Sequence, residues 1–228
     1  MKLIVVSTET FFAQETTAVP ALFEAGLEIF HLRKPHSTIE EMRDFLQKIP
    51  AQFHGRVVLH DHFSLLNEFA LKGVHINRRT PVETWRAASL STKMPHTETR
   101  RATSLHHHTS KSCHTLEEIK HISGFDYVFL SPIFDSISKN GYSKAFSHEE
   151  LLQAKRAGII NGKVIALGGV TPENIPQVAE YGFGGVAILG GLWADFEITG
   201  DVQSLLERFN VYRTQMNGLL FTKKYSHP

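Results

Sequence analysis

Short apolar runs alternate with helical patterns along almost the whole chain, and this alternation restricts the possible folds more than any other feature. Each run is nearly continuous in apolar character, which is typical of strands buried on both faces of a sheet. Seven runs are clear: residues 3–7, 27–33, 56–61, 73–77, 126–132, 163–169 and 185–190. Because a strand, a helix and a parallel strand form a right-handed crossover, the pattern predicts a parallel α/β fold.

The segments between the runs contain signals for helix starts and stops. An apolar stripe in residues 19–23 precedes Gly26, and a second stripe in residues 42–49 precedes Pro50. Capping-box spacing, which marks a helix start, occurs at Thr38 with Glu41, Thr115 with Glu118, and Ser147 with Glu150. These signals predict helices directly before and after the apolar runs.

An eight-stranded barrel needs one further strand between residues 77 and 126, where the sequence is polar. We place this fifth strand near residues 109–113 and expect the helix in residues 78–101 to be short or lost. The alternative is an open doubly wound sheet, but no G-x-G-x-x-G motif follows the first run. We therefore predict a single (β/α)8 TIM barrel in residues 1–220 and a C-terminal tail in residues 221–228.

Composition narrows the class of ligand and the compartment. A net charge of +1 gives no broad basic surface for nucleic acid. The one cysteine, Cys113, excludes an internal disulfide and fits a reducing compartment. The N-terminal apolar run is too short for a signal sequence, and no stretch is long enough to span a membrane. We expect a cytoplasmic protein that binds small molecules rather than nucleic acid or membrane, and we leave homo-oligomer formation open.

Polar residues stand at the C-terminal ends of the predicted strands, which is where the active site of a β/α barrel lies. These residues are His31 and Arg33, His60 and Asp61, His75 and Asn77, Ser112 and His114, and Ser131. Their position at the ends of apolar strands predicts one functional site at this end of the barrel.

Glycines follow the last two strands, at Gly168-Gly169 and after Leu189 at Gly190. Glycine leaves backbone N–H groups open to a phosphate, because no side chain blocks the approach of the anion. These positions predict a phosphate site, with tight turns alone as the alternative interpretation.

The loop after the sixth strand, residues 131–142, carries two hydroxyls and a cation at Ser136, Ser138 and Lys139. This combination suits a phosphate or pyrophosphate and could form a mobile lid. The alternative is a solvated polar loop.

The ordered set of motifs resembles the thiamin phosphate synthase and thiazole tautomerase family over residues 3–193. The motifs are HLR, HD, GVHI, SCHTLEE, DYVFLSPIFDSISK, VIALGGV and GFGGVAILG. The resemblance implies a synthase that joins hydroxymethylpyrimidine pyrophosphate to thiazole phosphate with magnesium and releases pyrophosphate. The implied catalytic residues are His31, Arg33, His60 and Lys139, and the implied metal ligand is Asp61. The implied substrate-binding residues are Ser112, His114, Ser136, Ser138, Gly168, Gly169, Leu189 and Gly190.

The chain departs from the synthase pattern at the magnesium site. His31 stands where the family has glutamine, His60 where it has asparagine, and Thr80 where it has a second carboxylate. Since magnesium prefers oxygen ligands, these changes weaken its site. The tautomerase branch needs no metal and also has histidine after strand two, but Pro132 occupies the position of its catalytic histidine. We expect a synthase-like transferase, with a metal-independent thiazole tautomerase or a non-catalytic phosphate-ligand sensor as alternatives.

Overall fold

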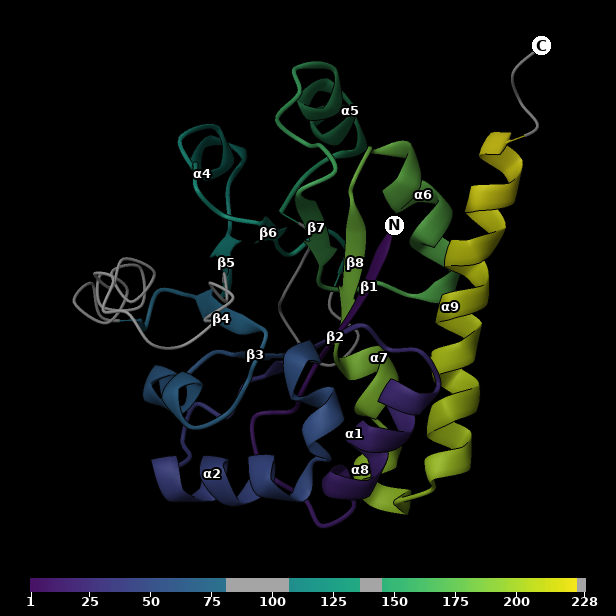
Figure 1. Ribbon diagram of the computed structural model, residues 1–228. Helices are drawn as coiled ribbons and strands as arrows, with labels where there is room; N and C mark the ends of the chain where they lie inside the picture. The colour runs from purple at the N-terminus through teal and green to yellow at the C-terminus, as the bar shows by residue number, and fades with distance from the viewer. Residues whose placement is uncertain (81–106, 136–144, 225–228) are drawn as a thin grey trace.

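The structure is a computed structural model that describes residues 1–80, 107–135 and 145–224, and it is a closed barrel of parallel strands (Figure 1). The strands are β1 (Lys2–Val6), β2 (Ile29–Leu32), β3 (Val57–Leu59), β4 (Gly73–Ile76), β5 (His108–Cys113), β6 (Tyr127–Leu130), β7 (Val164–Leu167) and β8 (Gly185–Ile188). They follow one another in sequence order around the barrel, and β1 pairs with β8 to close it. The predicted TIM barrel is therefore confirmed, with its polar fifth strand at the expected place.

Helices surround the barrel and connect successive strands. They are α1 (Glu15–Glu24), α2 (Ile39–Lys48), α4 (Leu116–Lys120), α5 (His148–Arg156), α6 (Ile175–Glu180), α7 (Gly190–Trp193), α8 (Phe196–Thr199) and α9 (Val202–Lys224). Three 3-10 turns, η1 (Ala51–Arg56), η2 (Phe63–Asn67) and η3 (Pro172–Asn174), complete the described connections. The helix expected within residues 78–101 falls almost entirely outside the described residues. The long helix α9 lies along the outside of the barrel beside α1 and α6 and continues to Lys224 (Figure 1).

Two of the three predicted capping boxes form as expected. The backbone N–H of Thr38 donates to Glu41 at 2.8 Å, and that of Ser147 donates to Glu150 at 2.7 Å. In both, the hydroxyl of the first residue accepts the returning hydrogen bond. At the start of α4, the Glu118 carboxylate instead accepts from the backbone N–H of His114, at 2.6 Å. This third box is therefore one-sided, because the carboxylate ties the helix to the end of β5.

The alternation of side chains along each strand separates two cores. One core lies between the strands and the helices and holds residues such as Phe30, Leu59 and Val74. The other fills the barrel interior and contains Ile4, Val6, Ile29, Val58, Tyr127, Phe129, Ile165 and Ala187. Since successive strand residues point to opposite faces, His31, His60 and His75 point inward from the β2–β4 side. The interior is therefore apolar on one side and rich in imidazole on the other.

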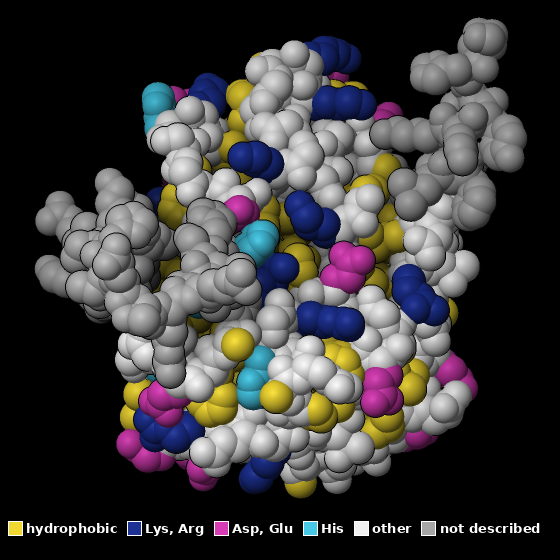
Figure 2. All heavy atoms as spheres, in the orientation of Figure 1, with side chains coloured by type: hydrophobic (Ala, Val, Ile, Leu, Met, Phe, Trp, Pro, Cys, Tyr) yellow, Lys and Arg dark blue, Asp and Glu magenta, His cyan; other side chains and the backbone are white. Residues whose placement is uncertain are grey.

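The surface agrees with the small net charge. The face drawn in Figure 2 carries side chains of both charges, with Lys and Arg more frequent over its middle and upper part and Asp and Glu mostly along its lower edge. None of the helices in the described ranges is long and apolar enough to cross a membrane.

Candidate functional site

A cavity of about 640 Å³ opens where the strands end at their C-termini. Its walls include most of the strand-end residues that the sequence indicated, together with three residues of the loop after β1. The lining residues are Val6, Thr8, Glu9, Thr10, Arg33, His60, Asn77, Arg78, Arg79, Ser112, His114, Phe129, Ser131, Leu167, Leu189, Gly190, Trp193, Ala194 and Glu197. The structure thus brings together Arg33, His60, Ser112, His114 and Gly190, although they come from the ends of four different strands, β2, β3, β5 and β8.

Beneath the cavity lies a chain of buried polar side chains. Nδ1 of His31 lies 2.8 Å from Nε2 of His60, and Nε2 of His31 lies 2.6 Å from the hydroxyl of Tyr127. His31 is fully buried and does not line the cavity, whereas His60 does. A hydrogen-bonded path therefore leads from the cavity wall into the barrel core.

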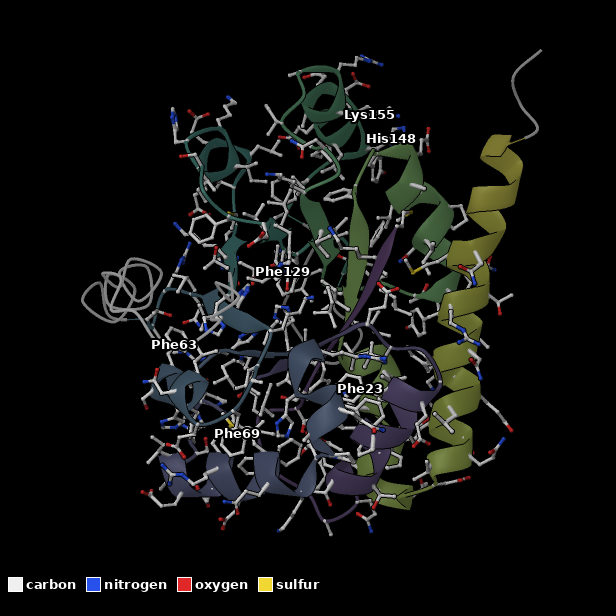
Figure 3. The ribbon with its side chains drawn as sticks, in the orientation of Figure 1. Phe23, Phe63, Phe69, Phe129, His148 and Lys155 are labelled. Carbon is white, nitrogen blue, oxygen red and sulfur yellow. The ribbon has the colours of Figure 1, made fainter. Side chains whose placement is uncertain are left out.

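A third imidazole, His75, completes this group. Its Nδ1 lies 2.9 Å from the hydroxyl of Ser110, and its Nε2 lies 2.7 Å from that of Ser112, which lines the cavity. The ring of His75 stacks on that of His60, with centroids 4.2 Å apart. Phe129, labelled near the centre of Figure 3, packs against the rings of His31 and His75 at 4.8 Å and 4.7 Å.

Burial keeps all three imidazoles neutral. Desolvation lowers the pKa of His31 and of His60 well below the usual value, and the neighbouring His75 adds to both effects. Desolvation and, second, the charge of Arg33 lower the pKa of His75 to about 3. Each ring can therefore donate from one nitrogen and accept at the other near neutral pH.

Arginine side chains provide the positive charge of the cavity. Nη1 of Arg33, at the end of β2, lies 2.9 Å from the Glu9 carboxylate. Arg78 and Arg79 follow β4 and contribute two further guanidinium groups to the wall. Guanidinium groups bind phosphate oxygens in a planar, bidentate manner, so this wall suits a phosphorylated ligand.

Lys34 directly follows Arg33 but points away from the cavity. Its Nζ lies 2.7 Å and 2.8 Å from the two oxygens of Glu15, and both side chains are fully buried. It also donates to the backbone oxygen of Thr10 at 2.7 Å. Lys34 therefore adds no positive charge to the cavity wall.

Asp61 directly follows His60 and has one oxygen that could accept a cation. Its Oδ1 lies 3.8 Å from Arg79, while its Oδ2 is buried without a hydrogen-bond partner among the described residues. Thr80, in the position of the second carboxylate, accepts instead from the backbone N–H of Asn77 at 3.1 Å. The donor set fits a divalent cation that takes one ligand from the protein and the others from substrate and water.

The two glycines after β7 are required by the backbone. Gly168 and Gly169 have φ angles of +94° and +64°, and a Cβ on Gly169 would lie 2.3 Å from the backbone oxygen of Asp135. Neither glycine lines the cavity, whereas Leu189 and Gly190 after β8 do. The phosphate contacts predicted for Gly168, Gly169, Leu189 and Gly190 stay predictions. Ser136, Ser138 and Lys139 lie outside the described residues.

Sequence reasoning did not single out several residues of the site. Thr8, Glu9 and Thr10 line the cavity directly after β1, and their position after the first strand was an available signal. Trp193 also lines the cavity, and its indole N–H donates to the backbone oxygen of Val6 at 2.8 Å. Tyr127 could not be distinguished from an ordinary core residue by its spacing. The one cysteine, Cys113, is buried, and burial raises the pKa of its thiol to about 11.

Comparison with known proteins relates this cavity to one family. The family described as "Thiamine monophosphate synthase" matches residues 3–192. The chain belongs to this family. The thiamine-phosphate synthase of Bacteroides fragilis is 24% identical over 201 residues, which cover 84% of the chain and 91% of that protein. That of Nitrosococcus oceani is 25% identical over 195 residues, which cover 84% of each protein.

Solved structures give the same result. The thiamine phosphate pyrophosphorylase of Bacteroides thetaiotaomicron has a TM-score of 0.77 and 38% identity, covering 95% of the chain and 98% of that protein. The thiamine phosphate pyrophosphorylase of Pyrococcus furiosus has a TM-score of 0.68 at 19% identity, with 96% of each chain covered, and shows the fold alone. The family resemblance drawn from the strand-end motifs is therefore confirmed, and the chain is placed among the transferases of thiamine biosynthesis.

Proposed function

We propose that the protein is a thiamin phosphate synthase, which joins hydroxymethylpyrimidine pyrophosphate to thiazole phosphate and releases pyrophosphate. The observation that carries the proposal is the cavity wall formed by Arg33, Arg78 and Arg79, in a barrel that belongs to the synthase family. A leaving pyrophosphate develops negative charge on its oxygens, and fixed guanidinium groups stabilise that charge.

Arg33 and the two arginines after β4 hold the pyrophosphate group in this proposal. Arg33 already faces the cavity in its ion pair with Glu9, and Arg79 lies 3.8 Å from Asp61. The part of the wall at the ends of β5 and β8, with His114, Leu189 and Gly190, then binds the thiazole phosphate. Nδ1 of His114 lies 3.2 Å from the backbone oxygen of Ser131, which orients its ring along this wall.

Magnesium would be held through Asp61, whose Oδ2 is buried and lacks a partner among the described residues. When bound, the ion would neutralise charge on the pyrophosphate oxygens. Thr80 supplies no second carboxylate, so the arginines provide the remaining positive charge at this end of the cavity.

Turnover of the two substrates tests the proposal directly. We expect release of pyrophosphate that requires magnesium and falls sharply in Asp61→Asn. Arg56→Ala is the matched control, because Arg56 binds backbone oxygens of Phe23 and Leu27 on the outside of the barrel. Binding of either substrate without turnover would contradict the proposal and favour a sensor.

The buried path from His60 through His31 to Tyr127 supports a second candidate, a thiazole tautomerase. A tautomerase moves a proton between two positions of its substrate, and neutral imidazoles in a hydrogen-bonded chain can both give and accept one. In this case proton exchange on thiazole carboxylate phosphate would continue in the presence of chelator and stop in His60→Gln. Magnesium-dependent coupling of the two synthase substrates would exclude this candidate.

A further inference from the structure

Three histidines from neighbouring strands converge at the floor of the cavity. His31 lies in β2, His60 directly follows β3, and His75 lies in β4. One ring nitrogen of each histidine can serve as a metal ligand, and these three nitrogens lie within 4.8 Å of one another. They form the only group of this kind within the described ranges. The strand order places them side by side because β2, β3 and β4 are consecutive in the barrel.

Burial prepares the three rings for a metal. A metal binds the lone pair of an imidazole nitrogen, and His31, His60 and His75 are all buried in the folded chain. The cost of removing the imidazoles from water is therefore already included in folding.

Hydrogen bonds on the far side of two rings fix their orientation. The Tyr127 hydroxyl holds Nε2 of His31, so Nδ1 of His31 faces His60 at 2.8 Å. The Ser110 hydroxyl holds Nδ1 of His75, so Nε2 of His75 faces the cavity side, where it meets Ser112. A partner on the second ring nitrogen is the usual support of a metal-binding histidine.

The cavity gives access to this group from one side. His60 and the Ser112 hydroxyl both line it, while Phe129 packs against the deeper rings. Catalytic zinc sites have this arrangement: three protein ligands hold the ion, and a fourth position is open to solvent or substrate.

We propose that His31, His60 and His75 bind one divalent transition-metal ion of the zinc type, with a fourth position open to the cavity. Imidazole ligands favour zinc, cobalt, nickel and copper over magnesium, so this site differs in kind from the oxygen of Asp61. The ion replaces the hydrogen bonds of His31 to His60 and of His75 to Ser112. The ring of His60 turns out of its stack on His75 to point its lone pair at the ion, and the hydrogen bonds from Tyr127 and Ser110 remain. The inference concerns binding and does not rest on the proposed function.

Cobalt titration of the metal-stripped full chain tests the site without an activity assay. We expect one Co²⁺ per chain, with the intense visible absorption bands of a four-coordinate ion, and displacement of Co²⁺ by Zn²⁺. The bands should be lost in His31→Gln and in His75→Gln. They should remain in His148→Gln, whose ring lies outside the group and 2.9 Å from the Tyr181 hydroxyl.

Two further variants keep the result interpretable. Tyr127→Phe removes the hydroxyl that supports His31 and should weaken Co²⁺ binding by about tenfold. This variant remains informative if a histidine variant fails to fold by circular dichroism. Replacing His106, His107 and His108 by Gln removes the histidine tract of the sequence. Absence of the bands in the unmodified chain would overturn the proposal. Bands that survive both cluster substitutions but vanish with the tract would overturn it as well.

Discussion

Nζ of Lys34 lies 2.7 Å from Oε2 of Glu15, and neither side chain has any exposed surface. The ammonium group also packs over the ring of Phe11, 4.7 Å from its centroid. The pair joins the end of β2 to the start of α1 and so holds the loop that carries Thr8, Glu9 and Thr10 against the cavity. Desolvation raises the pKa of Glu15 to about 7, more than the attraction of Lys34 lowers it.

Breaking this pair should destabilise the fold strongly. We expect Lys34→Met to lower the free energy of unfolding by about 3–5 kcal/mol, because it leaves the Glu15 carboxylate buried without a partner. The double variant Lys34→Met with Glu15→Leu should recover a large part of the loss. Urea denaturation measures both values. Lys120→Met removes an exposed pair with Glu117 and should leave the midpoint unchanged; a loss equal to that of Lys34→Met would contradict the argument.

The buried imidazoles should make the fold sensitive to acid. Their folded-state pKa values lie below the ordinary value of 6.5, so the unfolded chain binds more protons between the two values. Stability is therefore complete above about pH 6.5 and falls as the pH drops through the window below it, which for His75 extends to about pH 3. Each histidine contributes a slope of about 1.4 kcal/mol per pH unit.

Denaturant titrations at a series of pH values test this slope. In His75→Gln, the dependence of the free energy of unfolding on pH below 6 should be shallower by about one proton. His121→Gln is the control, because His121 is exposed and paired with Glu117. Equal slopes in the unmodified chain and in His75→Gln would show that His75 is not buried in its neutral form.

Arg33 should discriminate between ligands. We expect Arg33→Ala to weaken binding of a pyrophosphate-bearing ligand by about tenfold or more, because a charge-assisted hydrogen bond in the cavity is lost. Binding of thiazole phosphate should change less. Calorimetry with each ligand measures the difference, and Arg43→Ala, which removes a surface pair with Glu68 at 2.6 Å, serves as control. An equal loss of affinity for both ligands would contradict the assignment of Arg33 to the pyrophosphate group.

Substitution by alanine should destabilise the protein more at Gly169 than at Gly158, a glycine of similar backbone conformation. Gly158 has φ +70° and open space around its Cβ position, so Gly158→Ala should cost about 1–2 kcal/mol of stability from backbone strain alone. Gly169→Ala adds a clash with the backbone of Phe134 and Asp135, which displaces the loop after β6. We expect a larger loss of stability and weaker ligand binding, measured by thermal unfolding and calorimetry. Similar behaviour of the two variants would contradict the close approach.

The sequence alone was enough for the architecture and for much of the cavity rim. Apolar runs, helix stripes and capping boxes depend on residues within a few positions of one another, and β1 to β4 and β6 to β8 lie where those patterns placed them. The polar strand β5 lies where closure of an eight-stranded barrel required it. Two of the apolar runs end in Arg33 and His60, and the fifth strand ends in Ser112 and His114; all four residues line the cavity. Because all strands of a β/α barrel end on one face, local patterns also predicted which residues would meet there.

Which side chains contact one another was decided only by tertiary structure. His31 and Tyr127 are 96 positions apart, and their 2.6 Å contact depends on strand register and on closure of the barrel. Lys34 and Arg33 are adjacent cations in the sequence, yet one is buried against Glu15 and the other faces the cavity. Local periodicity determines the face on which a side chain lies, whereas its partner is set by distant segments that the closed barrel brings together.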